Sequence, residues 1–99
     1  MTEIPEPSSF TPASEPFEHI VATGFDDGDG VLVDLNTKQY YQLNETAMLI
    51  WRGLETGKSV EDIVSELMAV YDVNGDHARA SVNKLLQNLA IRKLIKARE

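Results

Sequence analysis

The order of apolar and polar residues predicts three strands followed by three helices. Apolar and β-branched residues are concentrated at 18–23, at 31–35 and at 39–43, and short polar segments separate these stretches. Two Asp-Gly steps lie between the first two stretches, and residues 36–38 lie between the second and the third. Short turns of this kind join antiparallel strands. The first half of the chain is therefore expected to form a small three-stranded antiparallel sheet.

Beyond the third stretch the apolar residues recur every three to four positions, which is typical of helices. Asn44 is a candidate N-cap of a first helix, and Gly57 is a candidate for the left-handed residue that ends it. Ser59 has an acidic residue three positions later and is expected to open a second helix. Asn74-Gly75 breaks this helix, and Asp76 is the expected cap of the third.

This order of elements predicts an α+β fold in one domain. All four prolines fall within residues 1–17, among Ser, Thr and Glu, so this segment buries too little apolar surface to offset the entropy of ordering it. We expect a disordered, acidic, Pro-rich tail at 1–17 and a folded domain at 18–99. Residues 94–95 either form a short last strand or pack beneath the third helix.

Composition and charge narrow the class of protein. The chain has 99 residues, of which 42% are apolar and 25% are charged, as in one ordinary globular domain. The net charge is -7, and residues 1–30, with seven acids and no Lys or Arg, supply the whole imbalance. Residues 79–98 hold six of the nine bases. Because non-specific nucleic-acid binders carry a basic excess over the whole domain, the charge argues against that class.

No segment points to a membrane or to export. The longest apolar runs are only a few residues long, far short of the roughly 20 that a spanning helix needs. The N-terminus has neither a basic segment nor an apolar stretch of the kind found in signal peptides. We therefore expect a cytoplasmic protein without membrane contact.

The sequence carries no pattern of residues that indicates catalysis. It has no cysteine, no Gly-x-Ser-x-Gly motif and no Gly-rich phosphate loop. His19 and His77 lie far apart with no metal-ligand spacing around them. The Asp-rich segment 26–30 lacks the register of a calcium loop and is better explained as a hairpin turn. No enzyme activity, cofactor or metal is expected of this chain.

Two kinds of binding protein fit the pattern. The second and third helices, joined by a short turn, are compatible with a helix-turn-helix that reads DNA, although the third helix has few bases and the N-terminal arm is acidic. Alternatively, if strand 39–43 lies at the edge of the sheet, its unpaired main-chain groups can accept a peptide as an added strand. In that strand we expect one tyrosine in the core and the other at the surface.

Several segments resemble the PqqD-like family, the RiPP recognition elements. The string Tyr-Tyr-x-Leu-Asn-x-Thr-Ala-x-x-Ile-Trp at 40–51 is similar to the stand-alone members found with lasso-peptide biosynthesis. The segment Gly-Lys-Ser-Val-Glu-Asp-Ile-Val at 57–64 is similar to the family's Gly-Arg-Ser/Thr-Val-x-x-Ile-Val segment, and 82–95 resembles its last helix and closing residues. Lys93 departs from the pattern, since the family usually has a glycine there.

The resemblance implies a winged helix-turn-helix-like domain that is not an enzyme. Such a domain captures the leader of a ribosomally synthesised precursor peptide as an extra strand and presents it to a separate modifying enzyme, which is a peptidase, a cyclase or a radical SAM enzyme. Carried over to this sequence, the resemblance places the leader on strand 39–43 and against one flank of the third helix. The expected peptide-binding residues are Gln39, Tyr40, Tyr41, Gln42, Leu43, Arg79, Asn83, Leu86 and Ala90.

The resemblance also implies roles for the charged residues. Arg79 and Lys84 are expected to pair with carboxylates of the leader. The acidic tail is a solubilising segment or, alternatively, a segment that occupies the groove until a leader displaces it. A winged-helix DNA-binding transcription regulator is the alternative function.

Overall fold

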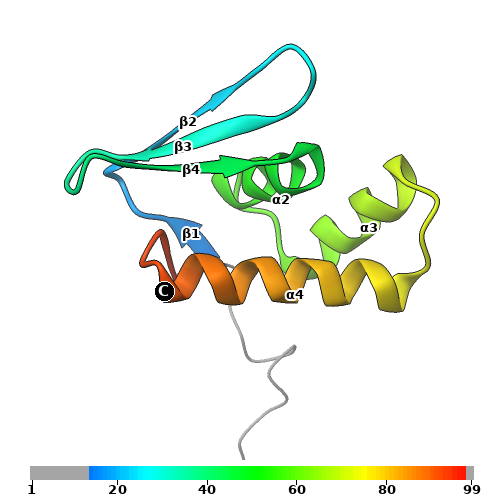
Figure 1. Cartoon of the computed structure of the whole chain (residues 1–99). Helices are drawn as coiled ribbons and strands as arrows, with labels where there is room; N and C mark the ends of the chain where they lie inside the picture. Colours follow the sequence, from blue (N-terminus) through cyan, green and yellow to red (C-terminus); the bar gives the residue numbers. More distant parts are fainter. Residues whose placement is uncertain (1–13, 98–99) are drawn as a thin grey trace, which may run out of the picture.

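The computed structural model describes residues 14–97, which form an α+β domain (Figure 1). A three-stranded antiparallel sheet in the order β2-β3-β4 precedes three helices, as the sequence predicts. A separate two-stranded sheet joins the two ends of the described chain. The elements in chain order are β1 (Ser14–Pro16), β2 (Ile20–Gly24), β3 (Gly30–Asp34), β4 (Gln39–Leu43), α2 (Glu45–Glu55), α3 (Val60–Val70), α4 (Gly75–Ile91) and β5 (Ile95–Ala97).

The two tight turns of the sheet follow from local chemistry. Between β2 and β3, Gly28 has a φ of 97° and the main-chain N–H of Asp29 donates to Asp27 Oδ1 at 3.0 Å. The Asp-rich segment is thus a hairpin turn, as expected. Between β3 and β4, Lys38 has a φ of 65°, and its N–H donates to the Asp34 carbonyl at 2.7 Å. Both turns place a residue in the left-handed region, which reverses the chain within a few residues.

Side-chain caps set the start of each helix. Asn44 caps α2 by accepting from the N–H of Ala47, and Ser59 caps α3 by accepting from the N–H of Asp62. Both caps confirm the prediction. Gly57, with a φ of 82°, lies directly after α2 in the expected left-handed conformation.

The predicted cap of the third helix is wrong by two residues. Asn74, not Asp76, is the N-cap of α4, and its side chain accepts from the N–H of His77 at 2.8 Å. Asn74 has the extended backbone that an N-cap needs, whereas Asp76 already lies in the first helical turn. There the negative charge of the Asp76 carboxylate stabilises the helix, because the N-terminus of a helix carries a partial positive charge.

The small sheet of β1 and β5 was not predicted from the sequence. β1 pairs with β5 in antiparallel register, with Glu15 opposite Lys96 and Pro16 opposite Ile95. Residues 14–17, which the sequence analysis assigned to the tail, are therefore part of the folded domain. The rest of the predicted tail, residues 1–13, lies outside the described residues. Of the two alternatives for residues 94–95, a short last strand or packing beneath the third helix, the strand is present from Ile95 onward as β5. The side chains of Leu94 and Ile95 are both buried.

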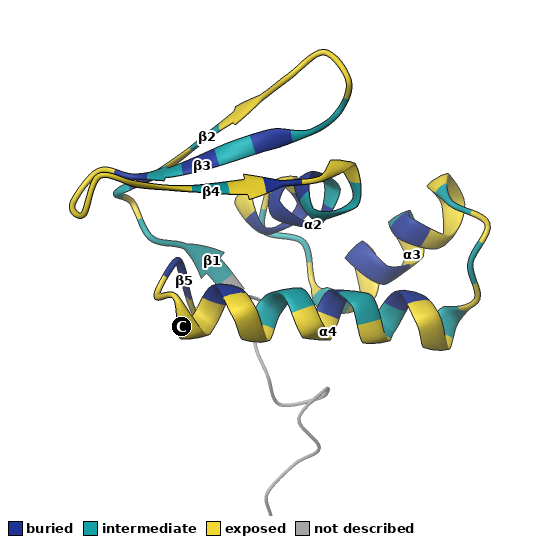
Figure 2. Cartoon of the chain, in the orientation of Figure 1, coloured by how far each residue is buried: buried dark blue, intermediate teal, exposed yellow. Residues whose placement is uncertain are grey.

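A single apolar core joins the sheet to the helices (Figure 2). α2 lies in its centre and contacts β1, β4 and α3. Trp51 on α2 is the largest fully buried side chain, and its Nε1–H donates to Glu55 Oε2 at 2.9 Å. The buried apolar residues are Ile20, Leu32, Leu43, Met48, Ile50, Trp51, Leu54, Ile63, Val64, Leu67, Ala78, Val82, Leu89, Leu94 and Ile95. Along residues 14–97, no helix has the length and apolar character that crossing a membrane requires.

Asp34 is a buried carboxylate that stabilises the turn into β4. Its Oδ1 accepts the main-chain N–H groups of Asn36 at 2.9 Å and Thr37 at 3.1 Å, and His19 Nε2 lies 3.8 Å away. Burial raises the pKa of Asp34, but the hydrogen bonds from Thr37 and Asn36 and the nearby His19 outweigh it, so the pKa is lowered from its usual value.

We expect this carboxylate to make the domain acid-sensitive. Because the pKa of Asp34 is lower in the folded chain, its stabilisation is complete above the unfolded pKa of about 3.9. It is lost as the pH falls below that value and through the lower pKa of the folded state. Urea unfolding at several pH values between 7 and 3 measures the effect. Asp34→Asn keeps a hydrogen-bond acceptor but loses the charge. Its free energy of unfolding should therefore fall less steeply with decreasing pH than that of the unmodified chain. Equal pH dependence of the two proteins would contradict this assignment.

Candidate functional site

The edge of the main sheet formed by β4 is open within residues 14–97. β3 is central, so β2 and β4 each have one neighbour in the sheet. Figure 1 shows β4 passing above α2 and α4, whereas β2 lies on the side of the sheet away from the helices. An open strand edge presents unpaired N–H and C=O groups, which makes it a template for another strand.

The hydrogen-bonding direction of each residue in β4 follows from the neighbouring strands. Leu35, directly after β3, donates its N–H to the carbonyl of His19 on the β2 side. Main-chain N–H and C=O groups alternate in direction from one residue of a strand to the next. Leu32 is three positions before Leu35, so its groups point the opposite way, toward β4, where Leu32 lies opposite Tyr41. Tyr41 therefore directs its main-chain N–H and C=O at β3.

The residues on either side of Tyr41 have the opposite orientation. Tyr40 and Gln42 direct their N–H and C=O groups away from β3, toward the open edge, because of the same alternation. Their side chains are both exposed, so they lie on the outer face of the sheet. The open edge of β4 therefore presents the main-chain groups of two residues to an incoming strand.

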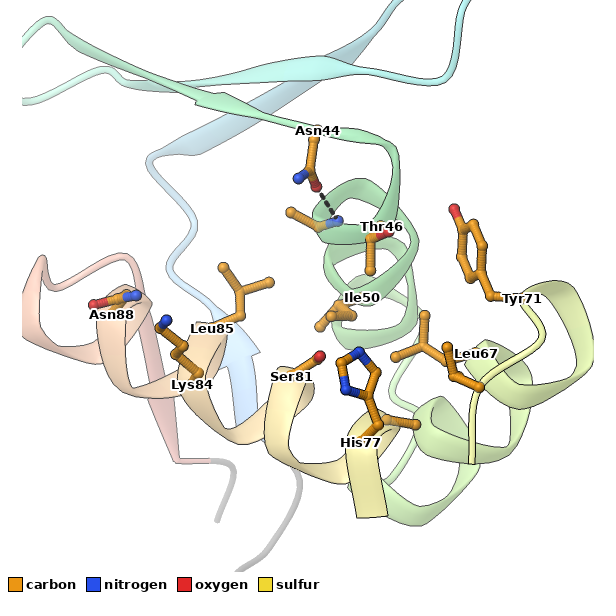
Figure 3. Close-up of a pocket in the computed structure, with 13 residues that line it drawn as sticks. Asn44, Thr46, Ile50, Leu67, Tyr71, His77, Ser81, Lys84, Leu85 and Asn88 are labelled. Atoms are coloured by element: carbon orange, nitrogen blue, oxygen red, sulfur yellow. Dashed lines mark hydrogen bonds between the residues drawn. The ribbon is translucent and has the colours of Figure 1, made fainter. Parts of the chain in front are cut away.

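A cavity lies beside this edge. It has a volume of about 450 Å³ and lies between the N-terminus of α2, the turn that joins α3 to α4, and one flank of α4 (Figure 3). Apolar side chains make its floor and polar side chains its rim, and no acidic residue lines it. The lining residues are Asn44, Thr46, Ala47, Ile50, Leu67, Tyr71, Val73, His77, Ala78, Ser81, Lys84, Leu85 and Asn88.

The flank of α4 that lines the cavity is not the predicted one. His77, Ser81, Lys84 and Asn88 lie at the cavity, whereas none of the predicted residues Arg79, Asn83, Leu86 and Ala90 lines it. The cavity therefore borders the flank of α4 opposite to the one predicted to face the leader, and the predicted wall stays a prediction. Leu86 is half-buried against the core, and Asn83 and Ala90 are exposed on the other side of the helix.

Arg79 has a partner within the domain. Its guanidinium forms a two-bond ion pair with the carboxylate of Glu61 on α3. Hydrogen bonding from Arg79 lowers the pKa of Glu61 from its usual value, and Glu61 in turn raises the pKa of Arg79. Arg79 thus joins α3 to α4 and is turned away from the cavity.

The two tyrosines of β4 point in opposite directions, as the sequence predicts. Tyr40 is 73% exposed on the outer face, whereas Tyr41 is half-buried and packs against the core. The Tyr41 hydroxyl donates to Gln39 Oε1 at 2.8 Å. The guanidinium of Arg92, the C-cap of α4, lies 5.6 Å from the centre of the Tyr41 ring. Tyr41 and Arg92 therefore connect β4 to the end of α4.

The open edge of β4 and the cavity-lining flank of α4 border one region of the domain. At one end Arg92 meets Tyr41, and at the other the cavity lies beside Asn44, directly after β4. β4 and α4 therefore run in opposite directions along the two walls. We call this region the β4–α4 groove, defined by the edge residues Tyr40 and Gln42, the cavity lining and Arg92.

Sequence reasoning missed the contribution of the α3–α4 turn. Tyr71, the C-cap of α3, lines the cavity, and its hydroxyl oxygen is buried without a hydrogen-bond partner in the described part of the chain. Val73 in the same turn also lines it. Tyr71 continues the apolar spacing of α3, so the sequence offered no signal to separate a cavity wall from a core position.

A search for metal-binding clusters gives no candidate in residues 14–97. No group of three or more His, Cys, Asp or Glu side chains is arranged there to hold an ion. His19 stacks on Phe17 with ring centroids 5.4 Å apart, and the other histidine, His77, lies at the cavity.

One family model and two solved structures match this chain. The family model for coenzyme PQQ synthesis protein D (PqqD) matches residues 29–95. A solved structure described as TbiB1 in complex with the TbiA(beta) leader peptide is 29% identical, with a TM-score of 0.78 over 86% of this chain and 98% of that chain. A lasso peptide synthetase B1 complexed with the leader peptide is 28% identical, with a TM-score of 0.76 over 85% of this chain and 98% of that one. No curated protein sequence matches significantly.

Proposed function

Because the chain belongs to the family of coenzyme PQQ synthesis protein D, we propose that it binds the leader of a ribosomally synthesised precursor peptide. The leader adds to the main sheet as a fourth strand and is presented to a separate modifying enzyme. The observation that carries this proposal is the open edge of β4 directly beside an apolar cavity. A strand edge supplies main-chain hydrogen bonds, and adjacent pockets select alternate side chains.

The proposed site keeps the predicted strand and revises the predicted helix wall. In β4, Tyr40 and Gln42 bond the leader main chain, and Tyr41 contacts its inward side chains. The cavity floor, with Ile50 and Leu85 among its apolar residues, accepts an apolar leader side chain. Of the predicted residues on α4, Arg79 is assigned to the contact with α3, and Asn83, Leu86 and Ala90 are left out of the site.

The role of the domain is recognition without catalysis. A recognition element of this kind binds the precursor and leaves the chemistry to its partner, which we propose to be a peptidase, a cyclase or a radical SAM enzyme. The cytoplasm, where newly translated peptides are first available, is the proposed location. Lasso-peptide biosynthesis is the proposed setting, since both similar structures contain a leader peptide and one is a lasso peptide synthetase B1.

The DNA-binding alternative receives no support from these observations. The bases of α4 and its C-cap do not form a row on one outer face of the helix: Arg79 pairs with Glu61, Lys84 lines the cavity and Arg92 lies over Tyr41. A recognition helix needs several bases directed at phosphates and base edges. Both similar structures contain a leader peptide.

A binding titration tests the proposal. The probes are the TbiA(beta) leader peptide and the leader of a short precursor encoded beside this chain, each labelled with a fluorophore, with fluorescence polarisation as the readout. We expect the second probe to bind with a dissociation constant of about 1 μM or tighter, equivalent to about 8 kcal/mol. Chemical shifts of the bound, isotope-labelled leader should have the values of an extended strand.

The control probes are a scrambled leader and a labelled DNA duplex. Neither should bind at the same protein concentration. If the leaders fail to bind while the duplex binds with a steep salt dependence, the proposal is wrong and the DNA-binding alternative is right.

A further inference from the structure

The positive charges of the domain fall into two groups. Arg52, Lys58 and Lys96 each have a carboxylate within 4 Å, and Arg79 is bound to Glu61. Within residues 14–97, no ion pair is found for the remaining four bases, which are Lys38, Lys84, Arg92 and Lys93. The unpaired bases also lie in a different part of the domain from the paired ones.

Two of the bases without a carboxylate partner, Lys84 and Arg92, lie at the β4–α4 groove. Lys84 extends from α4 toward the cavity, as Figure 3 shows, and Arg92 lies over Tyr41 at the other end of the groove. Lys38 directly precedes β4, and Lys93 directly follows Arg92. The groove therefore has a positive rim, although the whole chain has a net charge of -7. Such a local field attracts an acidic ligand independently of the net charge.

Lys84 and Arg92 have a spacing that an extended peptide can match. Lys84 on α4 and Arg92 at its C-cap are eight positions apart, so their backbone positions differ by about 12 Å along the helix axis at about 1.5 Å per residue. In an extended strand, side chains on one face recur every second residue, at about 7 Å, and every fourth residue, at about 13 Å. The interval of four residues is the closer match to the backbone spacing of the two cations.

We propose that the β4–α4 groove selects leaders that carry two acidic side chains four positions apart, one paired with Lys84 and the other with Arg92. This inference rests on the proposed leader-binding function. The two carboxylates lie on the face of the added strand that is turned toward α4. The Tyr41 ring holds the Arg92 guanidinium beside the strand edge. Because this side chain is already ordered, it loses little conformational entropy when a carboxylate of the leader binds it.

The test compares two double variants of equal net charge. Lys84→Gln/Arg92→Gln removes the two groove cations, and Lys58→Gln/Arg79→Gln removes two cations that are paired with Glu66 and Glu61 elsewhere. The probe is the labelled leader of the precursor encoded beside this chain, at about 50 mM and 500 mM salt. We expect the groove variant to lose roughly three- to tenfold in affinity at low salt and most of its salt dependence. The control variant should bind as the unmodified chain does.

A second set of peptides tests the spacing. In this leader every Asp and Glu is replaced by Asn and Gln, and two glutamates are then restored two, three or four positions apart. The pair four apart should recover the most affinity for the unmodified chain and none for the groove variant. Equal recovery at all spacings, or equal binding by both double variants, would overturn the inference while leaving leader binding intact. Loss of binding by every peptide and protein would instead contradict the proposed function.

Discussion

Gln42→Pro is expected to weaken leader binding by about 10- to 100-fold while leaving the domain folded. Gln42 directs its main-chain N–H at the open edge of β4, and proline has no N–H to donate. A leader carbonyl then loses its partner at a partly buried position, which costs about 1 to 3 kcal/mol. Fluorescence polarisation with the labelled leader measures the loss. Proline is tolerated on an edge strand when its nitrogen faces outward, so the fold should persist.

Two matched variants separate the lost donor from other effects. Gln42→Ala removes the same exposed side chain but keeps the N–H, and should bind the leader normally. Ala22→Pro makes the equivalent change in β2, at the other open edge of the sheet, and should also leave binding unchanged. Strand addition at β4 would be excluded if Gln42→Pro, shown to be folded by circular dichroism, bound as tightly as Gln42→Ala.

Trp51→Ala is expected to remove about 3 to 5 kcal/mol from the free energy of unfolding. Trp51 is completely buried at the centre of the core, and its loss leaves a large cavity between α2 and the elements around it. It also removes the donor to Glu55. Since domains are stable by only about 5 to 15 kcal/mol, the variant should unfold at a much lower denaturant concentration than the unmodified chain.

Chemical denaturation followed by far-UV circular dichroism measures this effect. Tyr40→Ala is the control, since it removes a large aromatic side chain that is exposed on the sheet and should change stability by less than about 0.5 kcal/mol. Similar unfolding midpoints for the two variants would show that Trp51 is not the centre of the core.

The helix and strand boundaries could largely be read from the sequence because they depend on local chemistry. An N-cap side chain bonds a main-chain N–H only three residues away, so Asn44 and Ser59 were recognisable from their own neighbourhood. β4 has the predicted bounds, because polar residues border a short stretch rich in strand-forming residues. The error at Asp76 arose because three adjacent residues, Asn74 to Asp76, all suit a helix start, and the backbone there decides which one acts.

The sheet of β1 and β5 could not be predicted in the same way. Its two strands have three residues each and are separated by the whole domain, from residue 16 to residue 95. Pro16 and the polar residues beside it also resemble a tail in composition. Only the closeness of the two chain ends in the folded domain allows this pairing, which no local pattern records.

In the proposed binding site, too, some features follow from the sequence and others from the tertiary structure. The sequence alone identified β4 as a candidate edge strand, and resemblance supplied the expectation that a helix flank faces it. The rotation of α4 about its own axis was decided by tertiary packing, in which Ala78, Val82 and Leu89 are buried and Arg79 is held by Glu61 on α3. The sequence determined which face of the helix is apolar, because helical periodicity is local. Which of the two polar flanks borders the groove depends on where β4 and α3 lie in space, and these are contacts between residues far apart in the chain.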